Sequence, residues 1–193
     1  MAVTTTRRDI LGTIASAALL GPLAADAAQH VHEEAATAAA TNVGVYKPKA
    51  LTAHEFDTLK TLCEIIVPGA SKGGAAEFID LLSSQNPEML AIYTGGIAWL
   101  DEAMKHHHQT DFLSATPEHH RELLDVLAYR KNRTDHTAAG IRFFDWARRM
   151  TVDAYYTSAA GIKEIGYTGN RAVREFKTPQ AAIDYAIKRS PFA

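Results

Sequence analysis

The sequence predicts an all-α protein, an irregular bundle of five or six helices with an extended N-terminal arm. Apolar residues recur at three- and four-residue spacing through most of the chain after residue 50, and several of these runs begin with helix-capping residues. No run alternates apolar and polar residues as a half-buried strand would. A length of 193 residues, 47% of them hydrophobic, suits one domain with its own core. The 20 basic and 22 acidic residues indicate no basic face for nucleic acid.

The first 27 residues are typical of a secretory signal. A basic start at Arg7 and Arg8 precedes a weakly apolar run from Leu11, and the sequence Ala-Asp-Ala at 25–27 resembles a cleavage site. The run is about 15 residues long, short of the roughly 20 that span a bilayer. The adjacent arginines, with Leu11 following, indicate twin-arginine export. We therefore expect 1–27 to be a twin-arginine signal peptide and the mature chain to be periplasmic; an amphipathic arm is the alternative.

Residues 28–50 are rich in Ala and Thr and show little apolar periodicity, so they predict an extended or disordered arm. The helical domain is predicted over 51–193. Its first helix has Thr52 and Glu55 as a capping box, and Pro68 with Gly69 ends it. Leu51 and Phe56 form the flanking hydrophobic staple.

Five further helices follow from capping residues and helical spacing. They are a short helix over 75–84, one from Asn86-Pro87 to about His107, one opened by Thr116-Pro117, a long one capped by Asp135 and running to about Ser158, and one opened by Thr178-Pro179 that ends near Arg189.

The long helix carries two apolar stripes. Ile141, Phe144 and Tyr155 form one stripe, and Phe143, Trp146, Met150 and Ala154 form its neighbour. Such a helix is either central to the bundle, or half core and half interface. Six of the sixteen aromatic residues lie close together here: Phe143, Phe144, Trp146, Tyr155, Tyr156 and Tyr167. Aromatic residues and arginine are enriched in the cores of protein interfaces.

Sequence motifs of stand-alone catalysis are missing, since there is no dinucleotide-binding, phosphate-loop or serine-hydrolase motif. His106, His107 and His108 cannot all face one metal on a helix, because consecutive side chains point about 100° apart. Exposed histidines at a helix end are favoured for this cluster, and for His119-His120, over a metal pair gathered by an unwound end. We predict no catalytic, cofactor-binding or metal-ligating residue in this chain.

Cys63 is the one cysteine, which rules out an internal disulfide, a c-type haem attachment, a thiolate zinc site and an iron–sulfur cluster. It lies on the apolar face of the first predicted helix, which favours a buried free thiol. The alternative is an intermolecular disulfide, because an unpaired cysteine in an exported protein can bond to another chain.

An ordered set of motifs resembles the gluconate 2-dehydrogenase subunit 3 family, the small subunit of periplasmic FAD-dependent sugar and polyol dehydrogenases. After the twin-arginine start, the motifs are Leu51-Thr52, Ile65-Ile66-Val67-Pro68, Gly96-Ile97-Ala98-Trp99-Leu100-Asp101, Phe143-Phe144 with Arg148 and Thr151, Tyr155-Tyr156-Thr157-Ser158, Gly161-Ile162-Lys163 and Ile165-Gly166-Tyr167-Thr168-Gly169-Asn170. The stretch Ser158 to Lys163 departs from the Tyr-Gly-Gly-Asn of one common family form, so the partner's sugar stays open.

The resemblance implies a non-catalytic helper subunit. A large flavoprotein of the glucose–methanol–choline type, which carries the FAD and lacks its own export signal, would be its partner. This chain would bring the folded flavoprotein to the twin-arginine translocase, and a cytochrome c subunit with c-type haem would take the electrons and attach the complex to the membrane. The predicted contact residues are Phe143, Trp146, Arg149, Tyr155, Tyr156, Tyr167 and Asn170.

Two other functions stay open at this point. One is an independent helical periplasmic enzyme, or metal- or haem-binding protein, that uses His106–His108. The other is a structural periplasmic protein that forms a homodimer through the same aromatic residues.

Overall fold

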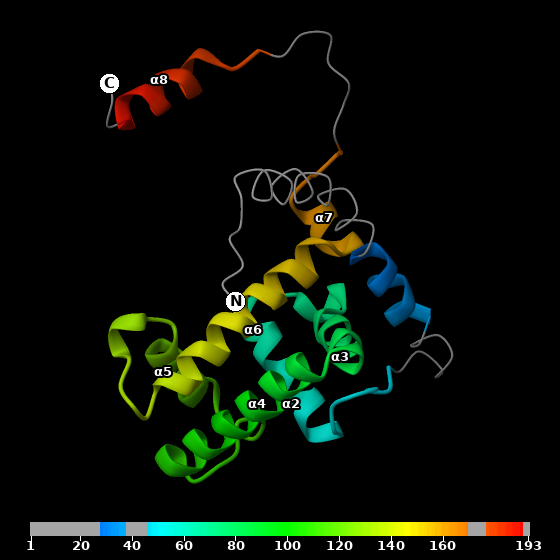
Figure 1. The fold of residues 1–193 in the computed structure, drawn as a ribbon, viewed down its shortest axis with the longest axis vertical. Helices are drawn as coiled ribbons and strands as arrows, with labels where there is room; N and C mark the ends of the chain where they lie inside the picture. Colours follow the sequence, from blue (N-terminus) through cyan, green and yellow to red (C-terminus); the bar gives the residue numbers. More distant parts are fainter. Residues whose placement is uncertain (1–27, 38–45, 170–176, 191–193) are drawn as a thin grey trace, which may run out of the picture.

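The computed structural model describes residues 28–37, 46–169 and 177–190, and it confirms the all-α prediction: no strand occurs within these ranges (Figure 1). The helices are α2 (Ala53–Ile66), α3 (Ala75–Gln85), α4 (Pro87–His108), α5 (Pro117–Leu127), α6 (Ala138–Tyr156), α7 (Ala159–Glu164) and α8 (Gln180–Arg189), with short 3-10 turns η1 (Ala70–Gly73) and η2 (Arg130–Asn132). A further helical segment covers 28–37. The predicted export signal of Arg7, Arg8 and Leu11 lies outside the described residues, as does Asn170.

Three predicted helix starts are confirmed by their capping hydrogen bonds. The Glu55 amide donates to the Thr52 hydroxyl at 3.3 Å, and the Thr52 amide donates to the Glu55 carboxylate at 2.8 Å, which completes the capping box of α2. Asn86 accepts from the first amides of α4, and Thr116 accepts from the amide of His119 in α5. These bonds satisfy amides that would otherwise lack a partner at a helix N-terminus.

The observed helix α6 differs at both ends from the long helix predicted between Asp135 and Ser158. Asp135 does not cap it; α6 begins after Thr137, and the amides of Thr134 and Thr137 each donate to the other's hydroxyl. At the far end the Ser158 hydroxyl donates to the carbonyl of Tyr155 at 2.6 Å and accepts from the Gly161 amide at 3.2 Å. One side chain therefore closes α6 and opens α7, so the predicted helix is two helices.

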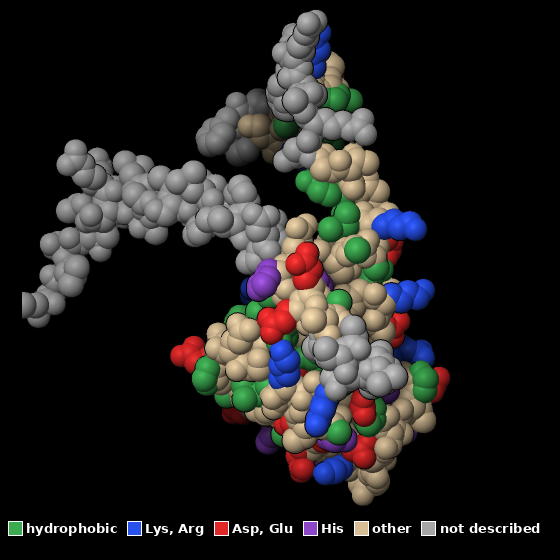
Figure 2. Space-filling view, turned by 90° about the vertical axis from the view of Figure 1, so that its right-hand side faces the viewer, with side chains coloured by type: hydrophobic (Ala, Val, Ile, Leu, Met, Phe, Trp, Pro, Cys, Tyr) green, Lys and Arg blue, Asp and Glu red, His purple; other side chains and the backbone are tan. Residues whose placement is uncertain are grey.

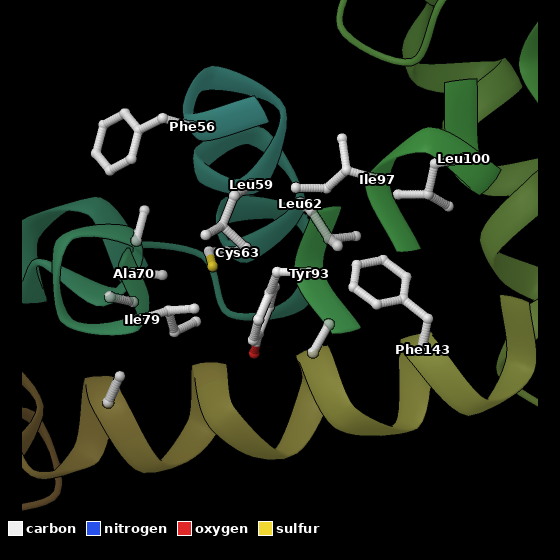
Figure 3. Close-up of a cluster of buried hydrophobic side chains, with 14 of the residues drawn as sticks. Phe56, Leu59, Leu62, Cys63, Ala70, Ile79, Tyr93, Ile97, Leu100 and Phe143 are labelled. Atoms are coloured by element: carbon white, nitrogen blue, oxygen red, sulfur yellow. The ribbon is translucent and has the colours of Figure 1, made fainter. Parts of the chain in front are cut away.

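Helix α6 is the central helix of the bundle. Figure 1 shows it running diagonally through the body, and it contacts α2, α3, α4, α5 and α7. Its inner face takes residues from both predicted apolar stripes, and the buried ones include Ile141, Phe143, Phe144, Ala147 and Ala154. Figure 3 shows side chains of α2 and α4 lying over α6, with the ring of Phe143 beside α4. The sequence left open whether this helix is central to the bundle or half core and half interface. The structure confirms that it is central, with its inner face buried in the core.

Two glycines allow α4 and α6 to pack closely. A Cβ atom at Gly96 would lie 2.0 Å from the ring of Phe143, and one at Gly140 would lie 2.3 Å from the ring of Trp99. Each helix therefore receives an aromatic ring of the other in the space of a missing side chain. Glycine within a helix costs about 1 kcal/mol relative to alanine, so the close aromatic packing has to offset that cost.

A buried carboxylate joins the segment before α2 to α3. Asp80 is fully buried, and its two oxygens accept hydrogen bonds from the Tyr46 hydroxyl at 2.8 Å and from the amides of Lys49, Ala50 and Leu51 at 2.7 to 3.1 Å. Three of these donors are backbone amides of a non-helical stretch, which need partners when buried. Asp80 therefore sets the path of the chain into the first core helix.

The predicted extended arm is wrong for residues 28–37, which form a helix packed on the body. Ala35 is buried, and the ring of His32 lies 4.7 Å from that of Phe78 and 3.0 Å from the Thr157 hydroxyl. Lys49 forms an ion pair with Glu34 at 3.0 Å. The inward apolar positions are Ala28, Val31 and Ala35, which bury little apolar surface, so contacts with the rest of the body stabilise this helix.

The two adjacent glycines of α4 provide a matched test of the close packing. We expect Gly96→Ala to lower the free energy of unfolding by about 1 to 3 kcal/mol, because the new methyl group overlaps the buried Phe143 ring. Gly95 is exposed with open space around it, so Gly95→Ala should raise stability by about 1 kcal/mol. Urea denaturation measures both, and equal effects at the two positions would contradict the packing argument.

Asp80 offers a second test. Asp80→Asn turns an amide group toward at least one of the donors that now share the carboxylate, and we expect a loss of about 3 kcal/mol in unfolding free energy. Asp57 is exposed on α2, so Asp57→Asn removes the same charge and should stay within about 0.5 kcal/mol of the wild type. An Asp80→Asn protein as stable as the Asp57→Asn control would show that the carboxylate does not anchor the segment.

Docking of the 28–37 helix should depend on pH through His32. Burial lowers the pKa of His32 below 6.5, an effect larger than the opposing hydrogen bond to the backbone of Ala154. The docked helix is therefore fully stabilised above pH 6.5 and is weakened as the pH falls below that value toward the lowered pKa. Amide hydrogen-exchange protection of 28–37 should fall as the pH is lowered below 6.5. A His32→Gln protein should lose this dependence; an unchanged pH profile in that variant would exclude His32 as the cause.

Candidate partner interface

Two of the predicted contact residues belong to the core of this chain. Phe143 is 5% exposed, lies over Gly96 and meets Tyr93 edge-on with ring centroids 5.9 Å apart. Tyr155 is 4% exposed and packs over Gly73. Neither side chain can reach another protein while the fold is intact. The prediction of Phe143 and Tyr155 as contact residues is therefore corrected: they support the surface from within.

The other described contact residues do lie on the surface, and they follow α6 into the turn after α7. Trp146 is 46% exposed, Tyr156 36% and Tyr167 55%. Sequence reasoning did not single out Ile165, which is 57% exposed, or Val152, which is 38% exposed. We call these five exposed residues the aromatic strip, after its three aromatic members: it consists of Trp146, Tyr156 and Tyr167 with the aliphatic Val152 and Ile165. The Ile165-Gly166-Tyr167 motif was the one available signal for Ile165, and nothing in the sequence separated Val152 from a core residue.

The far end of the strip is held by a well-bonded corner. The Tyr155 hydroxyl donates to the carboxylate of Glu164, which joins α6 to α7, and this bond is the main reason that the pKa of Tyr155 rises to about 12. A Cβ atom at Gly161 would lie 2.2 Å from the carbonyl oxygen of Tyr155, so only glycine fits there. The Tyr167 amide donates to the carbonyl of Ile162 at 3.1 Å. Hydrogen bonds therefore fix the backbone that carries the aromatic strip as far as Tyr167, its last residue.

Arg149, also a predicted contact residue, is exposed and bonded to Asp145. Its guanidinium donates to one Asp145 oxygen at 2.9 Å, and Arg148 donates to the other at 3.0 Å. Arg130 approaches the same carboxylate at 3.5 Å from the turn before α6. Charged and apolar side chains thus alternate along the outer face of α6. Figure 2 shows the same mixture on the face it displays, where hydrophobic side chains lie between blue and red ones.

The histidines predicted at the end of α4 line a cavity of about 710 Å³, together with Trp99, Met104 and Glu122. The ring of His108 stacks on that of His119 at 3.9 Å, and its Nε2 lies 3.5 Å from the Glu122 carboxylate. Within the part of the chain that the structure describes, no three such ligands are placed to hold one metal ion. His120 is not part of this group: it is buried and its Nε2 lies 2.7 Å from the Phe112 carbonyl.

Cys63 is a buried free thiol, not a surface one. It lies in the core beside Leu59, Leu62 and Ile79 (Figure 3), and the Thr151 hydroxyl is 3.3 Å from its sulfur. Burial raises the pKa of the thiol to about 12, so the reactive thiolate is scarce at neutral pH. The alternative of an intermolecular disulfide is therefore contradicted, because another chain cannot reach the sulfur.

The described helices include none that is both long enough and apolar enough to cross a membrane. In the comparison with protein-family models, residues 53–174 match the model described as Gluconate 2-dehydrogenase subunit 3. Searches of curated proteins and of solved structures returned no significant match. The family match covers more than half of the chain, from α2 through α7, and includes the whole aromatic strip. The chain therefore belongs to the gluconate 2-dehydrogenase subunit 3 family.

Proposed function

We propose that this protein is the non-catalytic small subunit of a periplasmic FAD-dependent sugar dehydrogenase, which it escorts through twin-arginine export and stabilises. Membership of the family makes it part of an oxidoreductase complex. In our proposal the FAD and the sugar site belong to a large flavoprotein subunit of the glucose–methanol–choline type. A cytochrome c subunit with c-type haem accepts the electrons and holds the complex at the membrane.

The aromatic strip is the observation that carries the proposal. Five large apolar side chains stay exposed along α6 and the α6–α7 corner, although the core beneath them is complete. Exposed tryptophan and tyrosine on rigid elements are the residues that most often dominate binding energy at protein interfaces. A pre-formed surface also loses little conformational entropy when a partner binds. The strip is therefore suited to gripping a folded protein.

The N-terminal sequence supports the export part of the proposal. Arg7, Arg8 and Leu11 form a twin-arginine pattern, and that route carries folded cargo. A flavoprotein that has already bound its cofactor must be exported folded, so a partner that binds its folded surface can bring it along. The same contact would then stabilise the flavoprotein in the periplasm by mass action.

Replacing the strip should break the complex without unfolding this subunit. The test uses Trp146→Ala with Tyr156→Ala, co-expressed with the proposed flavoprotein partner. We expect the affinity to fall about 100-fold or more, because two hot-spot aromatic residues are lost. Co-purification and periplasmic dehydrogenase activity should fall with it. The far-UV circular dichroism spectrum of the subunit should stay unchanged, since both side chains are exposed.

The matched control removes two exposed apolar side chains from α8, which lies outside the family match. Tyr185→Ala with Ile187→Ala should leave co-purification and activity at wild-type levels. A flavoprotein that is exported and active to the same extent without this subunit would refute the proposal. A subunit whose mass in solution is that of a dimer, disrupted by the strip variant while the flavoprotein is unaffected, would instead establish a homodimeric structural protein.

A further inference from the structure

Five arginines gather around a single carboxylate at the start of α6. We call this set the arginine cluster; it consists of Arg130, Arg133, Arg142, Arg148 and Arg149, with Asp145 among them. Arg130 and Arg133 come from the turn at η2, and the other three come from α6. All five arginines are exposed.

The cluster lines two adjoining hollows of about 210 and 250 Å³, which share Arg130, Ile141 and Asp145. The charged residues of the two linings are the five arginines and Asp145, a surplus of four positive charges. The whole chain has a formal charge of −2, so this surface differs in sign from the molecule as a whole. Such a concentration of one sign attracts an oppositely charged partner.

Fold stability alone does not explain the cluster. Arg148 and Arg149 share Asp145 with Arg130, but exposed ion pairs contribute only about 0 to 1 kcal/mol each. Arg133 and Arg142 form no ion pair among the described residues. Each guanidinium offers five N–H donors in a planar fork, whereas the one carboxylate has two oxygens. Within the described residues, most of these donors therefore have no carboxylate acceptor.

The shape and surroundings of the hollows favour carboxylates carried by a protein. The large apolar residues of the linings, Leu127, Ile141 and Phe144, are buried beneath the arginines, so the groups offered to a ligand are chiefly the guanidinium forks. Guanidinium forks match carboxylates with two parallel hydrogen bonds. The cluster is also continuous with the aromatic strip, because Trp146 lies one helical turn from both Arg142 and Arg149 on the outer face of α6.

We infer that the arginine cluster is the docking site for an acidic segment, rich in Asp or Glu, on the surface of the catalytic flavoprotein subunit. The inference rests on the proposed function and adds the chemistry of the contact. The aromatic strip supplies apolar burial, and the adjacent cluster selects a partner of the right charge and sets its orientation. Complementary charge of this kind raises the association rate and discriminates against wrong partners.

The test compares two charge-removing double variants in binding to the purified flavoprotein. Arg133→Gln with Arg142→Gln removes two positive charges from the cluster and leaves the three contacts with Asp145 in place. Lys60→Gln with Arg121→Gln removes the same charge from exposed positions around a different cavity, formed by α2 and α5. Surface plasmon resonance at about 50 and 500 mM NaCl gives Kd and the association rate in each case, with screening strong at the higher salt.

We expect the cluster variant to bind about tenfold more weakly at low salt, mainly through slower association, and to lose most of the salt dependence of the wild type. The control variant should match the wild type. If the wild type binds and both variants match it, the inference is wrong and the proposed function stands. If the wild type does not bind the flavoprotein at either salt concentration, the proposed function fails and the inference with it.

Anionic vesicles provide the last arm of the experiment. Wild-type protein is mixed with vesicles of phosphatidylglycerol and sedimented. No cosedimentation is expected, because the arginines line concave hollows instead of a flat face. Binding to vesicles that the cluster variant loses, with unchanged binding to the flavoprotein, would show that the cluster contacts a membrane surface and would overturn the inference.

Discussion

The close approach of α4 and α6 at two glycines is the contact on which the rest of the structure depends. Phe143 occupies the space beside Gly96, and Trp99 occupies the space beside Gly140, so the two longest helices interlock. This contact directs the inner face of α6 toward α2, α3 and α4, and the opposite face has no packing partner among the described residues. Core packing and the exposed surface of α6 are thus two results of one constraint.

That constraint links the fold to the proposed function. A subunit that grips a folded flavoprotein benefits from a surface that is rigid before binding, because less entropy is then lost. The outer face of α6 is fixed by the buried residues behind it, and the bond between Tyr155 and Glu164 fixes the corner with α7. Apolar and basic groups then lie on the same rigid face, one for burial and the other for selecting the partner.

Polar anchors complete the fold where helix packing ends. Asp80 gathers the backbone amides before α2, and Glu64 accepts from the amides of Gly69 and Ser71 after it, which lowers the pKa of the Glu64 carboxyl. His32 connects the 28–37 helix to the end of α6. These groups serve connections that helix packing does not shape, because backbone amides outside a helix that are shielded from water need another acceptor.

The all-α class and the caps at Thr52, Asn86 and Thr116 could be predicted from the sequence, because capping bonds and helical spacing involve residues within four positions of one another. The ordered motifs likewise pointed to the family before the structure was known. Helical spacing could not show which members of the two apolar stripes of α6 face inward: within one stripe, the tertiary contacts bury Phe143 and leave Trp146 exposed. The same holds for the helix at 28–37, whose contacts are with Phe78 and Thr157. Each of these depends on partners distant in the chain, and local pattern does not contain that information.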